Sequence, residues 1–248
     1  MTPFGPSSLL QTSSFDRALP VVLRFEGGWS NNAADPGGAT MKGVTQKVYD
    51  AYRRRRNLAP RPVKQIGNDE VAIIYREMYW SVVGCEDLPG GYDLVNFDAG
   101  VNSGPARARN WRMAVPVGPV PNMIKSYCAK RMSFVQGLRT FKVFGKGWSR
   151  RIADIEARAV AMYFGAAAVP ELKKAATDAR NTAGQQDKAA KGTGMGGGIA
   201  GGAAVANDHT MLWVALAVIV VAGIATVVWW KGQHNRERAA AFDRVAAE

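Results

Sequence analysis

Two carboxylates near the start of the chain have the types and spacing that cleavage of a glycosidic bond requires. Glu26 precedes Gly27-Gly28, and Asp35 begins the turn signal Asp35-Pro36-Gly37-Gly38 nine positions later. Such cleavage needs one carboxylic acid to protonate the leaving oxygen and a second group to activate water or stabilise the transition state. We therefore interpret Glu26 as a general acid that faces Asp35 across a cleft.

Thr40 extends this motif, since it follows Asp35 by five positions and is placed to hold a water with it. The glycines around these residues let the backbone come close to a sugar chain. A structural interpretation competes with the chemical one: Glu26 would be a carboxylate at a helix end, and Asp35 would only form a turn. Spacing alone leaves both interpretations open.

The elements that must position these residues are mostly short helices. Apolar spacing over 15–25 predicts a helix that stops at Glu26 because two glycines follow. An extended segment at 38–44 indicates half of a hairpin, and Thr45 is predicted to cap a helix that runs to about residue 56. Further helices are predicted at about 69–80, 93–101, 106–115, 121–139 and 149–168. The expected fold class is therefore mainly α, or α+β with one small hairpin.

The chain of 248 residues carries a formal net charge of +12, most of it before residue 171. Such a basic surface favours polyanions such as nucleic acid, anionic lipid or the bacterial cell wall, although simple solubility is an alternative explanation. The Arg53–Arg56 run is interpreted as a solvated basic patch. Cys85 and Cys128 lack metal or redox spacing and are expected to be buried free thiols. We assign no metal, no cofactor and no specific nucleic acid.

The C-terminal third has a different composition. Residues 171–208 are rich in Gly and Ala and are expected to form a flexible linker. Residues 211–230 carry no charge and are long enough for one transmembrane helix into a lipid bilayer, with tryptophans near both ends. A basic tail, 231–248, follows this span and favours a cytoplasmic C-terminus. Residues 1–14 are expected to be a disordered leader without an export signal, so the topology of the span stays open.

Several separated blocks resemble glycoside hydrolase family 108, a family of lysozyme-like N-acetylmuramidases. The blocks are Glu26-Gly27-Gly28-Trp29-Ser30, Asp35-Pro36-Gly37-Gly38-Ala39-Thr40, Lys42-Gly43-Val44-Thr45, Ile74-Tyr75-Arg76 with Tyr79-Trp80, Asn96–Pro105 and Gly147–Arg151. The resemblance covers about 15–165. It implies a lysozyme-like catalytic domain over 15–92 and a helical, peptidoglycan-binding half over 93–170.

The resemblance also implies roles for single residues. Glu26 matches the family's catalytic acid, while Asp35 and Thr40 correspond to the aspartate and threonine of phage-type lysozymes. The threonine spacing differs from those enzymes by one residue, so Thr45 is an alternative to Thr40.

Candidate substrate contacts are less specific than the catalytic ones. Trp29 lies beside the catalytic glutamate, and Tyr79 and Trp80 are candidates for stacking on sugar rings, although aromatic pairs at helical spacing are more often core residues. Asp98 and Asn102 are four positions apart on a predicted helix, where they either face the groove or form a polar cap network.

The sequence thus predicts a membrane-anchored muramidase that cleaves the β-1,4 bond between N-acetylmuramic acid and N-acetylglucosamine in peptidoglycan glycan strands. A water positioned by Asp35 would give inversion of configuration. A lytic transglycosylase and a non-catalytic wall-binding or virion membrane protein are the alternatives. The expected setting is phage lysis or phage entry, with assembly of a secretion apparatus as an alternative, and with the catalytic domain acting on the periplasmic wall from a bacterial or viral membrane.

Overall fold

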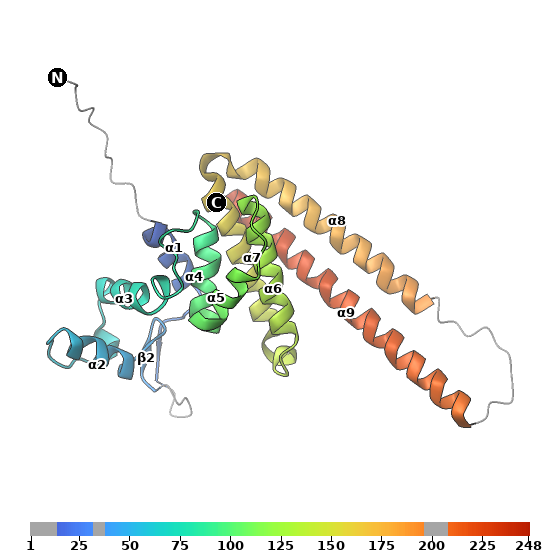
Figure 1. Ribbon diagram of the computed structural model, residues 1–248, viewed down its shortest axis with the longest axis horizontal. Coiled ribbons are helices and arrows are strands. Elements are labelled where there is room, and N and C mark those ends of the chain that lie inside the picture. The colour runs from blue at the N-terminus through green and yellow to red at the C-terminus, as the bar shows by residue number, and fades with distance from the viewer. Residues whose placement is uncertain (1–13, 32–37, 196–207) are drawn as a thin grey trace, which may run out of the picture. The chain divides into compact units, whose positions relative to one another are not determined.

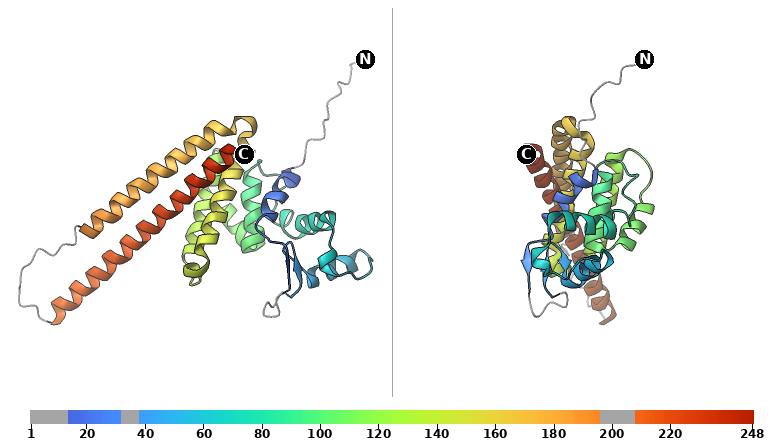
Figure 2. Two further views of the ribbon diagram at one scale, coloured as in Figure 1. Left: turned by 180° about the vertical axis from the view of Figure 1, so that it is seen from behind. Right: turned by 90° about the vertical axis from the view of Figure 1, so that its left-hand side faces the viewer.

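The computed structural model describes residues 14–31, 38–195 and 208–248, and over 192–195 and 208–225 it describes the backbone alone. The chain forms two compact units, Met1–Arg131 and Met132–Glu248. Figure 1 and Figure 2 show the elements of both units in order along the chain. The predicted leader lies almost wholly outside the described residues, since α1 begins at Ser14.

Unit 1 combines short helices with a three-stranded antiparallel sheet in the order β1-β2-β3. A helix that begins in unit 1, α6 (Val120–Gln136), ends in unit 2. The other elements of unit 1 are α1 (Ser14–Leu23), β1 (Trp29–Ser30), β2 (Thr40–Met41), β3 (Val44–Thr45), α2 (Gln46–Arg55), the 3-10 turn η1 (Val63–Gln65), α3 (Asn68–Tyr75), the π-helical turn η2 (Arg76–Trp80), α4 (Tyr92–Ser103) and α5 (Pro105–Met113).

The first helix, predicted to run to residue 25, ends two residues earlier, at Leu23. Its buried face consists of Phe15, Ala18, Leu19 and Val22, and the chain turns immediately before Gly27, which has a φ of +72°. A residue with a side chain adopts this left-handed conformation only at a cost, so the glycine fixes the end of the helical segment. Glu26 is held in the resulting turn.

A hairpin is present, but the prediction of one extended segment over 38–44 is wrong, because both strands, β2 and β3, and their turn fall within 40–45. Met41 pairs with Val44, which leaves Lys42 and Gly43 as a two-residue turn. Both turn residues have positive φ, 49° and 75°, as the tight turns that suit strand twist require. Thr45 then caps α2 by accepting a hydrogen bond from Val48 N at 3.3 Å, which confirms its predicted role.

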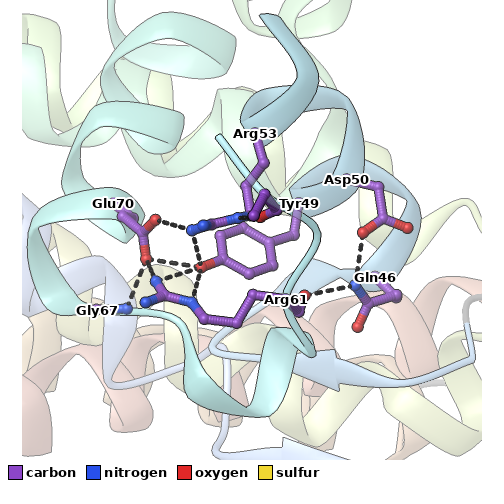
Figure 3. A network of polar contacts seen from close by, with 8 residues as sticks. Gln46, Tyr49, Asp50, Arg53, Arg61, Gly67 and Glu70 are labelled. Atoms are coloured by element: carbon purple, nitrogen blue, oxygen red, sulfur yellow. Dashed lines mark hydrogen bonds and ion pairs between the residues drawn. The ribbon is translucent and has the colours of Figure 1, made fainter. Parts of the chain in front are cut away.

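A buried polar network joins α2 to α3 (Figure 3). Glu70 accepts hydrogen bonds from Tyr49 Oη at 2.7 Å and Arg53 Nη1 at 2.8 Å, and it also pairs with Arg61. Burial alone would raise the pKa of Glu70, but the Gly67 N–H, Tyr49 and the two guanidinium groups outweigh it and lower that pKa. The prediction of a solvated patch is therefore wrong for Arg53, which is 9 % exposed because Glu70 draws it inward.

Unit 2 is built from the end of α6 and three further helices, α7 (Phe141–Phe164), α8 (Ala168–Met195) and α9 (Asp208–Ala247), with the short turn η3 (Gly165–Ala167) before α8. Helices α8 and α9 run antiparallel and side by side in all three views (Figures 1 and 2). The backbone of α9 is helical from Asp208 to Ala247 without a break.

The predicted flexible linker is wrong over 171–195, where the chain forms most of α8. Ala176, Ala179 and Ala183 are 3 % exposed or less and form one buried row on this helix. Alanine is the best helix former, and its small side chain lets a neighbouring helix approach closely. Residues 196–207 of the predicted linker lie outside the described residues.

The predicted basic tail, 231–248, is the C-terminal part of α9 and packs into unit 2. Ala241 and Phe242 are buried, and Arg238 forms two hydrogen bonds with Glu156 of α7, at 2.6 and 2.7 Å. Arg180 of α8 pairs with Asp243 at 2.6 Å. The charges of this segment therefore hold helices together instead of forming a free tail.

Within the described part of the chain, no helix has both the length and the apolar character needed to cross a membrane. The predicted span at 211–230 falls inside α9, and its side chains as far as residue 225 lie outside the described residues.

The network in Figure 3 predicts a large effect for Glu70→Gln. The substitution leaves Arg53 buried without its counter-charge, so we expect the free energy of unfolding to fall by on the order of 3 kcal/mol. Urea unfolding at pH 7 measures this loss. Because the pKa of Glu70 is lowered in the folded protein, its contribution is present above the unfolded value and disappears as the pH falls through the folded one, so the two proteins should converge in acid.

Glu77→Gln is the matched control for this experiment. Glu77 pairs with Arg56 at 2.5 Å, but its side chain is 43 % exposed. Exposed pairs contribute roughly 0–1 kcal/mol, so this variant should unfold almost as the wild type does. Equal destabilisation by both substitutions would contradict the network's role.

His234 of α9 predicts an acid sensitivity of unit 2. Burial, and next the positive charge of Arg238, lower the pKa of His234 to about 4, and no described side chain pairs with its Nδ1. The unfolded chain binds the proton near pH 6.5, so stability is complete above that pH and is lost as the pH falls towards 4. Between pH 7 and pH 4.5 the loss should be about 2 kcal/mol. His234→Gln should remove this pH dependence in urea titrations, and an unchanged slope would refute the assignment.

Candidate active site

Glu26 lies in the turn between α1 and β1. Its backbone N–H donates to Leu23 O at 3.3 Å, which keeps the residue attached to the last turn of the helix. The side chain is half-buried, and Trp29 of β1 follows three positions later. The carboxyl group thus lies where a helix, a glycine turn and the sheet meet.

The turn between β2 and β3 approaches Glu26 closely. A β-carbon at Gly43 would lie 3.2 Å from Glu26 Oε2 and would clash with Tyr75 Oη. Tyr75 in turn donates its hydroxyl to Lys42 O at 2.9 Å. The glutamate, the tyrosine and the turn therefore surround one point, and only a glycine fits at that point.

The π-helical turn η2 carries two neighbouring aromatic residues with different surroundings. Ser81 N donates to Arg76 O at 3.0 Å, the bond that inserts an extra residue into the helical turn. Tyr79 is half-buried near the carboxyl group of Glu26: burial, and next the negative charge of Glu26, raise the pKa of the Tyr79 hydroxyl. Tyr79 therefore lies near Glu26, and its contact with a sugar ring stays a prediction.

Trp80 points the other way, and its prediction as a sugar-stacking residue is wrong. It is 2 % exposed and meets Phe15 and Phe97 edge-on, each with ring centroids 5.4 Å away. A ring enclosed by two other rings has no free face for a sugar, so Trp80 is a core residue that anchors α1 and α4.

Trp29 remains available as a substrate contact. Its ring is 41 % exposed, and Lys64 Nζ lies 5.3 Å from the ring centroid. An exposed indole with a cation on one face presents an apolar surface for a sugar ring and a positive charge beside it. The two residues come from β1 and η1, which the sheet brings together.

The second predicted carboxylate, Asp35, lies outside the described residues. The loop that carries it is closed at its base, because Ser30 pairs with Thr40 across β1 and β2. Thr40 Oγ1 donates to Gly38 O at 3.0 Å, and Thr45, the alternative threonine, uses its hydroxyl to cap α2. Of the two threonines, Thr40 is therefore the one that lies beside the loop carrying Asp35.

The two remaining candidates, Asp98 and Asn102, both lie on α4 but have different surroundings. Asp98 is completely buried and pairs with Arg131 at 2.7 Å, so its prediction as a substrate-binding residue is wrong. A carboxylate enclosed in this way offsets the charge of a buried arginine and has no access to a substrate. Asn102, one helical turn later, is exposed and stays a candidate.

Sequence reasoning missed three residues that shape the site. Gly43 and Tyr75 were noticed only as parts of longer blocks, and Lys64 was not singled out. A detectable signal existed for the turn, since Lys-Gly between two short extended segments is typical of a two-residue hairpin. Both cysteines are buried free thiols, as predicted, and burial raises the pKa of Cys85 to about 12. Among the described residues, no three acidic, His or Cys side chains gather as a metal site.

Comparison with known proteins places this site in a family. The profile of the family described as Glycosyl hydrolase 108 matches residues 19–104, a stretch that contains Glu26, Gly43, Tyr75 and Tyr79. The solved structure of Brucella abortus SagA is similar, with 33 % sequence identity and a TM-score of 0.51 over 62 % of this chain and 98 % of that chain. No curated protein sequence matches the chain. The chain belongs to glycosyl hydrolase family 108 and is a glycoside hydrolase.

Proposed function

We propose that this glycoside hydrolase is a muramidase that cleaves the β-1,4 bond between N-acetylmuramic acid and N-acetylglucosamine in peptidoglycan, with Glu26 as the general acid. The observation that carries the proposal is the position of Glu26, half-buried against the turn at Gly43 and beside Tyr75 and Tyr79. A proton donor must be held at a fixed place relative to the leaving oxygen, and this close packing supplies that restraint.

The second catalytic group in this proposal is Asp35, with Thr40 beside it. The closed base of the β1–β2 loop supports the assignment, because it returns the chain to the sheet on which Trp29 lies. A water held by Asp35 would attack the sugar from the face opposite Glu26, with inversion of configuration. The sugar chain would pass over Trp29 and Lys64, with Tyr79 and Asn102 as further contacts.

The proposed setting is the bacterial cell wall next to a membrane. The +12 net charge favours the anionic wall, and the charge-free sequence at 211–230 favours a lipid bilayer. In this proposal the hydrolase acts on the periplasmic wall during phage lysis or phage entry.

Glu26→Gln tests the general acid. The amide has nearly the same shape but no acidic proton, so we expect release of reducing sugars from purified sacculi to fall by at least about 100-fold. Glu86→Gln, on an exposed loop residue, is the matched control and should retain full activity. Circular dichroism must show the same helix content in both variants, and retained hydrolysis by a folded Glu26→Gln variant would exclude the proposed role.

The products separate the proposal from its alternative. Hydrolysis leaves reducing muramic acid ends, and NMR of the first product shows which anomer forms. Anhydro-muramic ends seen by mass spectrometry would instead assign a transglycosylase that uses no water.

Gly43→Ala tests the close packing around Glu26. A methyl group there meets Tyr75 Oη and Glu26 Oε2 and forces a left-handed backbone on alanine, so we expect at least a ten-fold loss of activity and about 1–3 kcal/mol of destabilisation. Gly147→Ala is the control, because a β-carbon at that helical position meets open space.

A double-mutant cycle identifies the clash itself. Tyr75→Phe removes the oxygen that the new methyl group would meet, so the combined Gly43→Ala and Tyr75→Phe variant should be more stable than the sum of the two single effects predicts. Strict additivity in thermal unfolding would show that backbone strain alone, and not the contact with Tyr75, makes the glycine necessary.

A further inference from the structure

Five aromatic rings of unit 2 form a connected row, which we call the aromatic platform: Phe144, Trp148, Phe141, Trp230 and Trp229. Successive ring centroids lie 5.7 Å apart for Phe144–Trp148, 6.4 Å for Phe141–Trp148, 5.2 Å for Phe141–Trp230 and 5.1 Å for Trp229–Trp230. The row therefore runs from the start of α7 to the middle of α9. None of these residues takes part in the site around Glu26.

The platform ends in large apolar side chains that are open to solvent. Phe144 is 55 % exposed, Trp229 is 45 % exposed, and their neighbours Val143 and Val227 are 74 % and 55 % exposed. A groove of about 460 Å³ runs beside the row, lined by Leu138, Phe141, Lys142, Val227 and Trp230 together with residues 136, 137 and 139. Exposed apolar side chains concentrated in one place mark an interaction surface.

Positive charge borders this apolar surface. Arg139, Lys142 and Lys146 at the α6–α7 corner are exposed, as is Lys231 directly after the two tryptophans of α9. No acidic residue occurs between Gln136 and Trp148. A row of aromatic rings with basic side chains around it is the chemistry that suits the headgroup region of an anionic bilayer.

The register of α8 against α9 shows which part of α9 continues beyond the platform. Asn235 donates to Gln186 Oε1 at 2.9 Å, and Arg236 pairs with Asp187 at 2.5 Å. Antiparallel helices advance by the same rise per residue, so Met195, the end of α8, faces α9 about eight residues before this contact region, in the mid-220s. The backbone of α9 from Asp208 to about residue 220 therefore extends past the end of α8, and its sequence from 211 carries no charge.

We propose that the aromatic platform and its basic border are a docking surface for an anionic phospholipid bilayer. Phe144 and Val143 enter the headgroup region, and Lys142 and Lys146 contact lipid phosphates. The inference rests on the proposed membrane association of residues 211–230 and extends it to α7. A segment far from the apolar sequence along the chain thereby lies at the same level as Trp229 and Trp230.

The test is flotation of the full-length chain with lipid vesicles. The protein is synthesised in a cell-free system with vesicles of phosphatidylcholine alone or with a third of phosphatidylglycerol, and the bound fraction is measured. We expect the wild type to bind the anionic vesicles at least about ten-fold better and to lose this preference at high salt. Lys142→Glu with Lys146→Glu should abolish the preference, and Val143→Ser with Phe144→Ser should reduce binding to both kinds of vesicle.

Matched controls come from unit 1. Met113→Ser with Val117→Ser removes apolar side chains that are 74 % and 96 % exposed, and Lys47→Glu with Lys125→Glu reverses two exposed charges. Both controls should bind vesicles as the wild type does. Platform variants that bind like these controls would overturn the proposal.

Two further measurements separate this proposal from the others. All variants should release reducing sugars from sacculi at the wild-type rate without vesicles, so a wild type inactive on sacculi would refute the muramidase function and leave the vesicle result standing. Platform variants that lose sacculus binding but keep vesicle binding would show that the surface recognises the wall, and would overturn the lipid assignment.

Discussion

The approach of the Lys42–Gly43 turn to Glu26 and Tyr75 is the contact on which the arrangement around Glu26 in unit 1 depends. A two-residue turn requires positive φ at both positions, and here it also has to fit against a carboxylate and a phenol hydroxyl. One glycine satisfies both demands, because it accepts the backbone conformation and occupies no side-chain volume. The sheet, the end of α1 and the end of α3 thereby meet at one place, and the carboxyl group of Glu26, the proposed general acid, lies there.

The π-helical turn follows from this packing. Tyr79 and Trp80 are consecutive, so their side chains project about 100° apart on a helical turn, and Trp80 is buried in the core while Tyr79 lies near Glu26. A π turn lacks the regular hydrogen-bond pattern and is less stable than an α-helical one, so it persists only where surrounding packing determines it. The edge-on contacts of Trp80 with Phe15 and Phe97 supply that packing.

Local signals made the ends of helices and strands predictable. Contacts between residues distant in sequence could not be predicted in this way. The glycines after Glu26 and the cap at Thr45 each act within a few residues, so the sequence was sufficient to place the end of α1 to within a few residues and the start of α2. Arg53, Asp98 and Trp80 were misassigned because residue type was the only guide. An arginine suggests the surface, and an aspartate or a tryptophan suggests a substrate contact, until the packing partner is known. Their partners, Glu70, Arg131 and Phe97, lie 17, 33 and 17 positions away.

The prediction of a flexible linker in the Gly/Ala-rich stretch was wrong for a related reason. The helix found there changes how the C-terminal third should be understood. Alanine suits both a linker and a tightly packed helix, and only the presence of α9 against it decides between them. Up to residue 195, the predicted flexible linker is therefore a packed helix, α8. The ion pairs from Arg238 to Glu156 and from Arg158 to Glu248 tie the end of α9 to α7, and the charge-free sequence at 211–230 belongs to the same unbroken helix. Any surface that this segment meets must therefore accommodate the α6–α7 corner as well.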